Sequence, residues 1–218
     1  MNDGGAPNEL VVVLDEAGVP TGESLPLDEV LARGAWHGAI VAWGVRGSGE
    51  VLLSRLPREH ALEPLRLAPT ATTLAGLGLP AEAVTAALRS WLGGPLQVGE
   101  PRYLGTFRSE RRYRTSSGET TIRQHQDAYL VRAEDPLEEL SPNPQFVDTV
   151  YELPVARAIA LLEAGDHAPV PGFDAMGRVS NALLVEEDLP SQGRAELLEQ
   201  LVAVAAALDG DLANTVHE

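Results

Sequence analysis

The side chains best suited to hold an anion gather in one short stretch of the chain. All 16 basic residues are arginine, and six of them fall between positions 102 and 123: Arg102, Arg108, Arg111, Arg112, Arg114 and Arg123. A guanidinium group grips phosphate or carboxylate through two parallel hydrogen bonds. This pattern predicts a ligand-binding patch made by Arg108, Arg111, Arg112, Arg114 and Arg123, to which Arg89 is added. It is equally consistent with ion pairing to acidic residues of the C-terminal region or of a second subunit.

Aromatic side chains accompany these arginines. Tyr103 and Tyr113 could stack on a nucleobase, although two tyrosines beside a strand pair are equally consistent with packing. A nucleotide-like diphosphate is therefore the ligand class that the sequence favours.

Several chemistries are excluded by missing residue types. The sequence contains no cysteine and no lysine, so thiolate, disulfide, cysteine-metal and Schiff-base chemistry are all absent. The histidines other than His37 are scattered along the chain and do not have the spacing of metal ligands. The G-x-S-x-G motif of serine hydrolases does not occur. The glycines at 76 and 78 lack the lysine that a phosphate loop requires.

The charge balance limits the possible partners. The formal net charge is −16, which disfavours nucleic acid and anionic membranes as partners. Residues 134–218 contain 17 Asp and Glu against 3 Arg, and so carry most of that charge. No apolar run is long enough for a transmembrane helix, and the first residues do not resemble a signal peptide, so a cytoplasmic protein is expected.

The elements that must position these residues are indicated by hydrophobic periodicity. Residues 9–15 predict a strand, residues 26–33 a short helix, and residues 36–45 and 50–56 a hairpin closed by a glycine-containing turn. Residues 80–92 predict a helix that Gly93 and Gly94 end.

The second half of the chain is predicted to contain a further strand pair and two helices. Strands are expected at 103–107 and 126–132, joined by an exposed polar connection, and helices at 154–164 and 191–208. The last helix has a broad apolar stripe that either docks on the domain or forms a dimer. The expected division is a flexible N-terminus at 1–8, a domain at 9–165 and an acidic extension at 166–218.

Several short motifs occur in a family order: LDEAGVPTGE, GAWHGAIVAW, GEVLLSRL, YLGTF and QDAYLVRAEDP. Over residues 9–165 the chain resembles the Nudix (MutT-like) hydrolase superfamily, in the branch similar to isopentenyl-diphosphate isomerase. The resemblance implies an α/β (α+β) fold: an α/β/α sandwich around a mixed sheet, here with a C-terminal helical extension. His37 matches a metal-ligating histidine of those isomerases, but the missing cysteine argues for a structural histidine.

The Nudix box, G-x5-E-x7-R-E-U-x-E-E-x-G-U, is degenerate in this sequence. Gly76 and Glu82 keep the spacing of the motif, and Arg89 stands one residue earlier than the arginine of the motif. The three glutamates that follow this arginine in the motif are replaced by small residues, Ser90, Gly93 and Gly94. Cleavage of a diphosphate needs Mg²⁺ or a similar ion held by carboxylates. No metal site and no cofactor are therefore expected, and Mg²⁺ or Mn²⁺ enters only if the chain is a hydrolase.

Three functions remain open from the sequence. The first is a catalytically impaired Nudix-fold module that binds a nucleotide-like diphosphate or acts as a scaffold, with a homodimer as a further expectation. The second is an active pyrophosphohydrolase that uses other carboxylates, for which Glu82, Glu110 and Glu119 are the candidates. The third is a protein-interaction module that uses the C-terminal helix.

Overall fold

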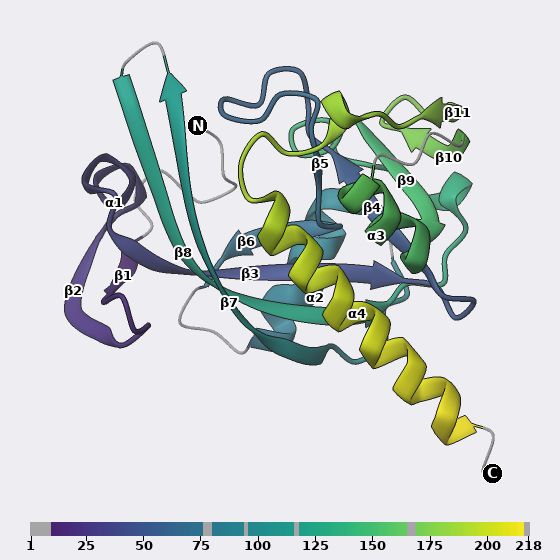
Figure 1. The fold of residues 1–218 in the computed structure, drawn as a ribbon, viewed down its shortest axis with the longest axis horizontal. Coiled ribbons are helices and arrows are strands. Elements are labelled where there is room, and N and C mark those ends of the chain that lie inside the picture. Colours follow the sequence, from purple (N-terminus) through teal and green to yellow (C-terminus); the bar gives the residue numbers. More distant parts are fainter. Residues whose placement is uncertain (1–9, 76–79, 94–95, 116–117, 165–168, 216–218) are drawn as a thin grey trace.

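The structure is a computed structural model that describes residues 10–75, 80–93, 96–115, 118–164 and 169–215 (Figure 1). Its strands are β1 (Leu10–Leu14), β2 (Pro20–Pro26), β3 (Trp36–Val45), β4 (Glu50–Arg55), β5 (Leu67–Ala68), β6 (Ala71–Leu74), β7 (Arg102–Thr115), β8 (Gly118–Arg132), β9 (Thr149–Pro154), β10 (Pro169–Asp174) and β11 (Val179–Leu183). The helices are α1 (Leu27–Arg33), α2 (Pro80–Leu92), α3 (Val155–Ala164) and α4 (Arg194–Thr215), with short 3-10 turns η1 (Leu137–Glu139) and η2 (Glu186–Asp188).

Strand β3 is the centre of a mixed sheet. It pairs antiparallel with β1, β4 and β6, and parallel with β8 along its whole length, from Trp36 opposite Arg123 to Val45 opposite Arg132. The main path of the sheet runs β11-β10-β9-β4-β3-β1-β2. A strand paired on every side must be apolar on both faces, which explains the continuous apolar run of β3.

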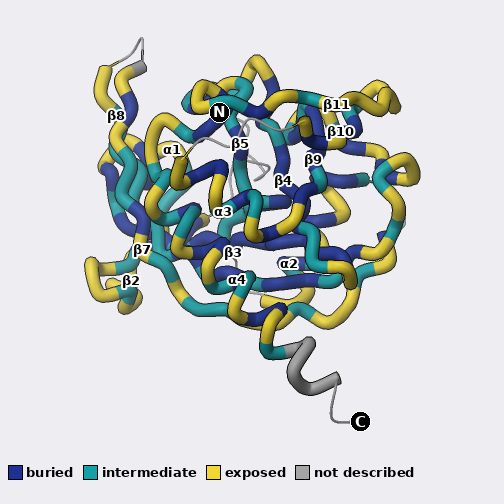
Figure 2. Tube along the Cα trace, turned by 45° about the vertical axis from the view of Figure 1, so that its right-hand side comes forward, coloured by how far each residue is buried: buried dark blue, intermediate teal, exposed yellow. Residues whose placement is uncertain are grey.

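Helices cover both faces of this sheet. Because successive side chains of a strand point to opposite faces, Trp43 joins the core under α3 and α4, while its neighbour Ala42 joins the core under α2. Figure 2 shows the buried segments in the middle of the molecule, with exposed segments around them. The molecule is therefore an α/β/α sandwich, as the sequence predicts.

Helix α4 packs on its own domain. Its apolar stripe, Leu197, Leu201, Val204 and Leu208, is buried in the same core cluster as Trp43 and Leu153. Of the two roles open for this stripe, the structure shows docking on the domain. No helix among the described residues is long and apolar enough to span a membrane.

Two parts of the predicted organisation need correction. The segment between 107 and 126, expected to be an exposed connection, forms most of a long two-stranded hairpin. Its strands β7 and β8 pair from Arg102 opposite Leu130 to Thr115 opposite Gly118. The turn-rich segment after 168 contains two strands, β10 and β11, that extend the sheet beyond β9. The extension thus shares the sheet and core of the preceding residues. The predicted boundary at 165–166 and the N-terminal residues 1–8 lie outside the described residues.

Candidate functional site

A pocket of about 230 Å³ lies between the β7–β8 hairpin, the first turns of α4, the loop before β5 and the end of α2. Helix α2 contributes Ser90 and Trp91, and β3 forms part of the floor with Val41. Ser90 is one of the residues that the sequence comparison sets at a glutamate position of the Nudix box. The pocket therefore opens beside the segment compared with that box.

Strand alternation selects which hairpin side chains enter the pocket. Arg111 and Tyr113 of β7 line it, as do Gln124 and Gln126 of β8. The residue between the first two, Arg112, points to the other side, where it contacts Glu110. Of the predicted arginine patch, Arg111 is the member that reaches the pocket.

Arg111 is held in place by its surroundings. Its Nε donates to Ser109 Oγ at 2.9 Å, and Ser109 Oγ lies 3.4 Å from Glu196 Oε1. A Cβ at Gly193 would lie 3.1 Å from the Arg111 side chain, so the glycine lets the guanidinium pack against the start of α4. The side chain is therefore ordered before any ligand arrives.

Glu63 ties the segment before α4 to the loop before β5. The Glu63 side chain is buried, and its carboxylate accepts hydrogen bonds from Ser191 N (3.1 Å), Ser191 Oγ (2.8 Å) and Gln192 N (3.2 Å). The backbone N–H of Glu63 donates to Nδ1 of His60 at 3.0 Å, which makes that ring nitrogen an acceptor. These contacts close one wall of the pocket.

Tyr113 is a protonated hydroxyl at all ordinary pH values. Burial raises the pKa of Tyr113 to about 12, with the Arg111 guanidinium opposing the shift and the Glu63 carboxylate adding to it. The tyrosine therefore presents a neutral O–H to its neighbours.

Glutamines form a chain of hydrogen bonds behind the pocket. Trp43 Nε1 donates to Gln200 Oε1 (3.2 Å), Gln200 Nε2 to Gln126 Oε1 (2.8 Å), and Gln126 Nε2 to Gln124 Oε1 (2.9 Å). Gln124 Nε2 lies 3.2 Å from Nε2 of His37, whose Nδ1 lies 3.1 Å from the carbonyl oxygen of Ala35. His37 is 1% exposed and takes part in this chain, which agrees with a structural histidine.

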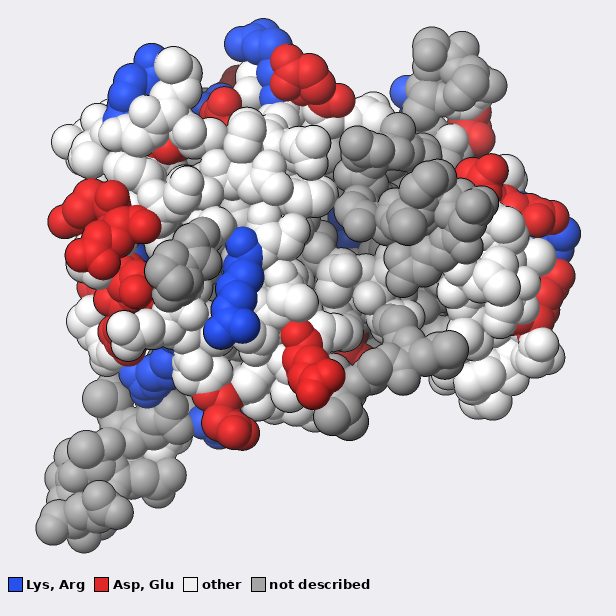
Figure 3. Space-filling view, turned by 180° about the vertical axis from the view of Figure 1, so that it is seen from behind, with Lys and Arg blue, Asp and Glu red and all other residues white. Residues whose placement is uncertain are grey.

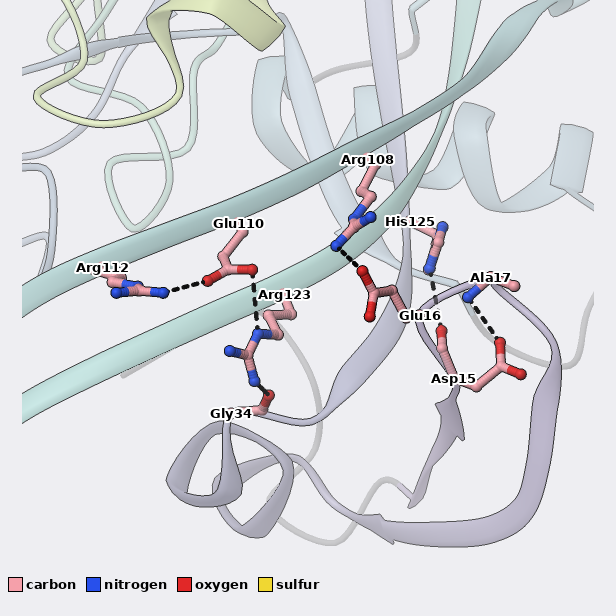
Figure 4. A network of polar contacts seen from close by, with 9 residues as sticks. All are labelled: Asp15, Glu16, Ala17, Gly34, Arg108, Glu110, Arg112, Arg123 and His125. Atoms are coloured by element: carbon pink, nitrogen blue, oxygen red, sulfur yellow. Dashed lines mark hydrogen bonds and ion pairs between the residues drawn. The ribbon is translucent and has the colours of Figure 1, made fainter.

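The other arginines of the predicted patch make contacts outside the pocket (Figure 4). Arg108 pairs with Glu16 at 2.7 Å and lies over the ring of Trp36 at 4.6 Å. Arg112 and Arg123 both pair with Glu110, at 2.9 and 3.4 Å. The two guanidinium groups lower the pKa of Glu110, with the hydrogen bond from Arg112 as the larger cause.

The remaining arginines are also apart from the pocket. Arg102 Nη1 donates to the carbonyl oxygen of Ala207 in α4 at 3.1 Å, while Arg114 and Arg89 are exposed. The six predicted binding arginines thus do not converge on one point. On the face seen in Figure 3 the blue basic groups stand apart from one another.

The residues present do not fit the metal centre that the family resemblance implies. Glu82 is exposed in the first turn of α2, Glu119 is exposed near the hairpin turn, and Glu110 is occupied by its arginines. In the part of the chain that the structure describes, no three His, Asp or Glu side chains are grouped as metal ligands would be.

Backbone geometry excludes a side chain at Gly93. Gly93 ends α2 with φ of +69°, and a Cβ at this position would lie 1.9 Å from the carbonyl oxygen of Ser141. No side chain, and so no glutamate, fits at this position. Gly76 and Gly94 lie outside the described residues.

The pocket contains several residues that sequence reasoning missed. Glu63, Glu196 and the glutamines come from segments far apart in the chain, and none carries a local motif. Tyr113 and Arg111 were accessible to prediction because they lie in the arginine-rich stretch.

The architecture is similar to that of known Nudix proteins. DR0079 from Deinococcus radiodurans gives a TM-score of 0.53 at 17% identity, over 72% of this chain and 91% of its own. The MutT protein from Methanosarcina mazei Go1 gives 0.45 at 11% identity, over 76% and 92%. The Nudix hydrolase RenU from M. smegmatis gives 0.38 at 16% identity, over 67% and 80%.

The similarity to DR0079 shows the fold alone. It agrees with the α/β/α sandwich that the sequence predicts. No protein-family model and no curated protein matches the sequence.

Proposed function

We propose that this chain is a Nudix-fold binding module that holds a small organic ligand in the pocket beside α2 and α4 and does not hydrolyse it. The observation that carries the proposal is the end of α2, where the backbone of Gly93 lies against Ser141 so closely that a metal-binding side chain has no room. Among the described residues at glutamate positions of the box, Ser90 lines the pocket, and it offers a neutral hydroxyl. A hydroxyl and a bare backbone position do not hold Mg²⁺ against water.

Order within the pocket supports binding. Arg111, Glu63 and Gln126 are fixed by hydrogen bonds to neighbouring residues, and a preformed site loses little conformational freedom when a ligand enters. The nucleotide-like diphosphate expected from the sequence is the alternative ligand class for this pocket, and the homodimer is a separate prediction. Ligand titration measures the first and analytical ultracentrifugation the second.

Hydrolysis is tested on a panel of nucleoside diphosphate-linked compounds, with Mg²⁺ or Mn²⁺ present or absent. Cleavage gives two monophosphates, from which added alkaline phosphatase releases inorganic phosphate for detection. We expect no release above the rate without protein. Metal-dependent release that Glu110→Gln or Glu119→Gln abolishes would instead support the pyrophosphohydrolase that uses carboxylates outside the box.

A pocket variant serves as the control for binding. Ser90→Trp places a large ring at the pocket from an exposed position of α2, so it blocks the pocket without disturbing the core. A ligand that raises the thermal midpoint of the wild-type chain should not raise that of Ser90→Trp. An equal rise in both proteins would place binding elsewhere.

A further inference from the structure

We infer that the pocket selects a small, flat, uncharged ligand with amide-type hydrogen-bonding edges, such as a heteroaromatic carboxamide or a nucleobase, and rejects its anionic counterparts. This rests on the proposed function, because it names the ligand class of the same pocket. Three observations point to it: the charges of the lining, its amide groups and its flat aromatic wall.

The charges of the lining disfavour an anion. Among the described residues around the pocket, the one guanidinium group, that of Arg111, stands against the carboxylates of Glu63 and Glu196. Arg111 already donates to Ser109, and His60 offers Nδ1 as an acceptor to the backbone of Glu63. A phosphate or carboxylate ligand would lie beside the two carboxylates of Glu63 and Glu196, with the single guanidinium of Arg111 to offset all three negative charges. The free-energy cost of this repulsion rises as the ligand is buried.

The amide groups favour a ligand that both donates and accepts hydrogen bonds. Gln124, Gln126 and Gln200 line the pocket and are linked to one another, with each link using one N–H of the donor amide. A carboxamide has two N–H donors and a carbonyl oxygen with two lone pairs, so each of these amides can form further hydrogen bonds. Gln145 and Gln192 add two more amides to the lining.

The shape of the pocket favours a flat ring of limited size. Trp91 and Phe146 both line the pocket and are stacked on each other, with ring centroids 5.7 Å apart and an interplanar angle of 9°. The volume of about 230 Å³ is below the range of roughly 300–1,000 Å³ of typical ligand sites. One ring system with its substituents fits such a volume better than a dinucleotide does.

The test compares ligands that differ in charge but share a ring. Nicotinamide is paired with nicotinate, and adenine with adenosine monophosphate, and binding is measured by ligand-observed NMR and calorimetric titration. The proteins are the full-length wild type, Ser90→Trp as the blocked pocket, Glu196→Gln as the charge variant, and Glu199→Gln as a matched exposed control on the same helix.

We expect a neutral ligand to bind the wild type at least tenfold more tightly than its anionic partner, and to lose binding in Ser90→Trp. Glu196→Gln should tighten binding of the anionic partner at least fivefold and change binding of the neutral one less than twofold. Glu199→Gln should behave as the wild type does in both titrations.

Two outcomes would overturn the inference alone. In the first, the anions bind the wild type as tightly as the neutral ligands and are not hydrolysed, so the pocket is a binding site for a different ligand class. In the second, no neutral ligand binds, or Ser90→Trp keeps the binding while circular dichroism shows a folded chain. Metal-dependent phosphate release from adenosine monophosphate or a diphosphate-linked compound would overturn the proposed function itself.

Discussion

Gly93 occupies a backbone position at which a side chain has no room. Its N–H bonds to the carbonyl oxygen of Arg89 at 3.0 Å, and its positive φ reverses the chain after α2. The same reversal brings Ser141 against it, since Ser141 N donates to the carbonyl oxygen of Leu92 at 2.9 Å. The helix end and the segment around Ser141 are therefore built around a residue without a side chain.

The Gly93→Ala substitution tests this packing. We expect it to lower the free energy of unfolding by about 3–4 kcal/mol, from left-handed backbone strain and from the forced displacement of Ser141. Gly177→Ala is the matched control, because Gly177 has a similar φ of +78° with nothing within 4 Å of the added Cβ. It should cost about 1–2 kcal/mol. Equal losses in urea denaturation would show that Ser141 does not restrict this position.

Tyr113 should make the free energy of unfolding depend on pH in the alkaline range. Its pKa of about 12 in the folded state exceeds the value of about 10 for an exposed tyrosine. The unfolded chain therefore loses this proton first as pH rises, and the associated stability, complete below about pH 10, is lost as pH rises toward 12.

The expected loss from this one group is on the order of 2 kcal/mol. Unfolding free energies measured between pH 9 and 12 should fall less steeply in Tyr113→Phe than in the wild type. A wild-type slope in Tyr113→Phe would contradict the assignment.

At the scale of elements, the buried carboxylate of Glu63 holds the last residues of the connection from β11 to α4. Glu63 accepts three hydrogen bonds from Ser191 and Gln192, just ahead of the first residue of α4. Since this connection forms a wall of the pocket, its opening would also open the pocket.

Glu63→Gln should loosen this connection. The amide puts N–H donors against the donors of Ser191 and Gln192, and removes a charge-assisted acceptor, at a cost of about 2 kcal/mol. If opening is local, amide hydrogen exchange at Ser191 and Gln192 should speed up by roughly 30-fold. Glu59→Gln, at an exposed glutamate of the same loop, is the control. Unchanged exchange would show that another contact holds the connection.

The elements differ in how well the sequence predicts them. The β3–β4 hairpin and α2 are predictable because their apolar residues follow the strand and helix periods and glycines mark their ends. The outer part of the β7–β8 hairpin is not, because Arg108, Arg112 and Arg114 are charged and exposed, so apolar alternation is absent. Figure 1 shows this part extending beyond the sheet. Pairing between β7 and β8 maintains it, together with burial of Ser109 and Tyr113 on one of its faces.

The candidate site is less predictable than the fold. The order of the short motifs predicts the correct fold. The pocket itself depends on contacts such as Gln126 with Gln200, and Glu63 with Ser191, across 74 and 128 positions. Contacts at such distances follow from the tertiary packing and leave no periodic signal in the sequence.

At the scale of the whole molecule, the acidic C-terminal part is integrated with the rest of the chain. Strand β10 pairs with β9, α4 packs on α3, and Arg102 of β7 donates to the backbone of α4. Despite its share of the negative charge, this part supplies core residues as well as exposed ones. Unfolding should therefore occur in one cooperative transition that includes α4.

Substitutions at two adjacent residues of α4 distinguish packing of this helix on its own domain from a role in dimer formation. Leu201 is fully buried, whereas Val202 is 51% exposed. Leu201→Ala removes packing against the core shared with β3 and β9, and should lower the free energy of unfolding by about 3 kcal/mol. Val202→Ala should change it by less than about 0.5 kcal/mol.

Urea denaturation followed by fluorescence at two protein concentrations measures both changes in the free energy of unfolding. The loss in Leu201→Ala should not depend on protein concentration. A large loss in Val202→Ala that grows as the protein is diluted would mean that the exposed face of α4 is covered by a second chain, because dissociation couples to unfolding through mass action.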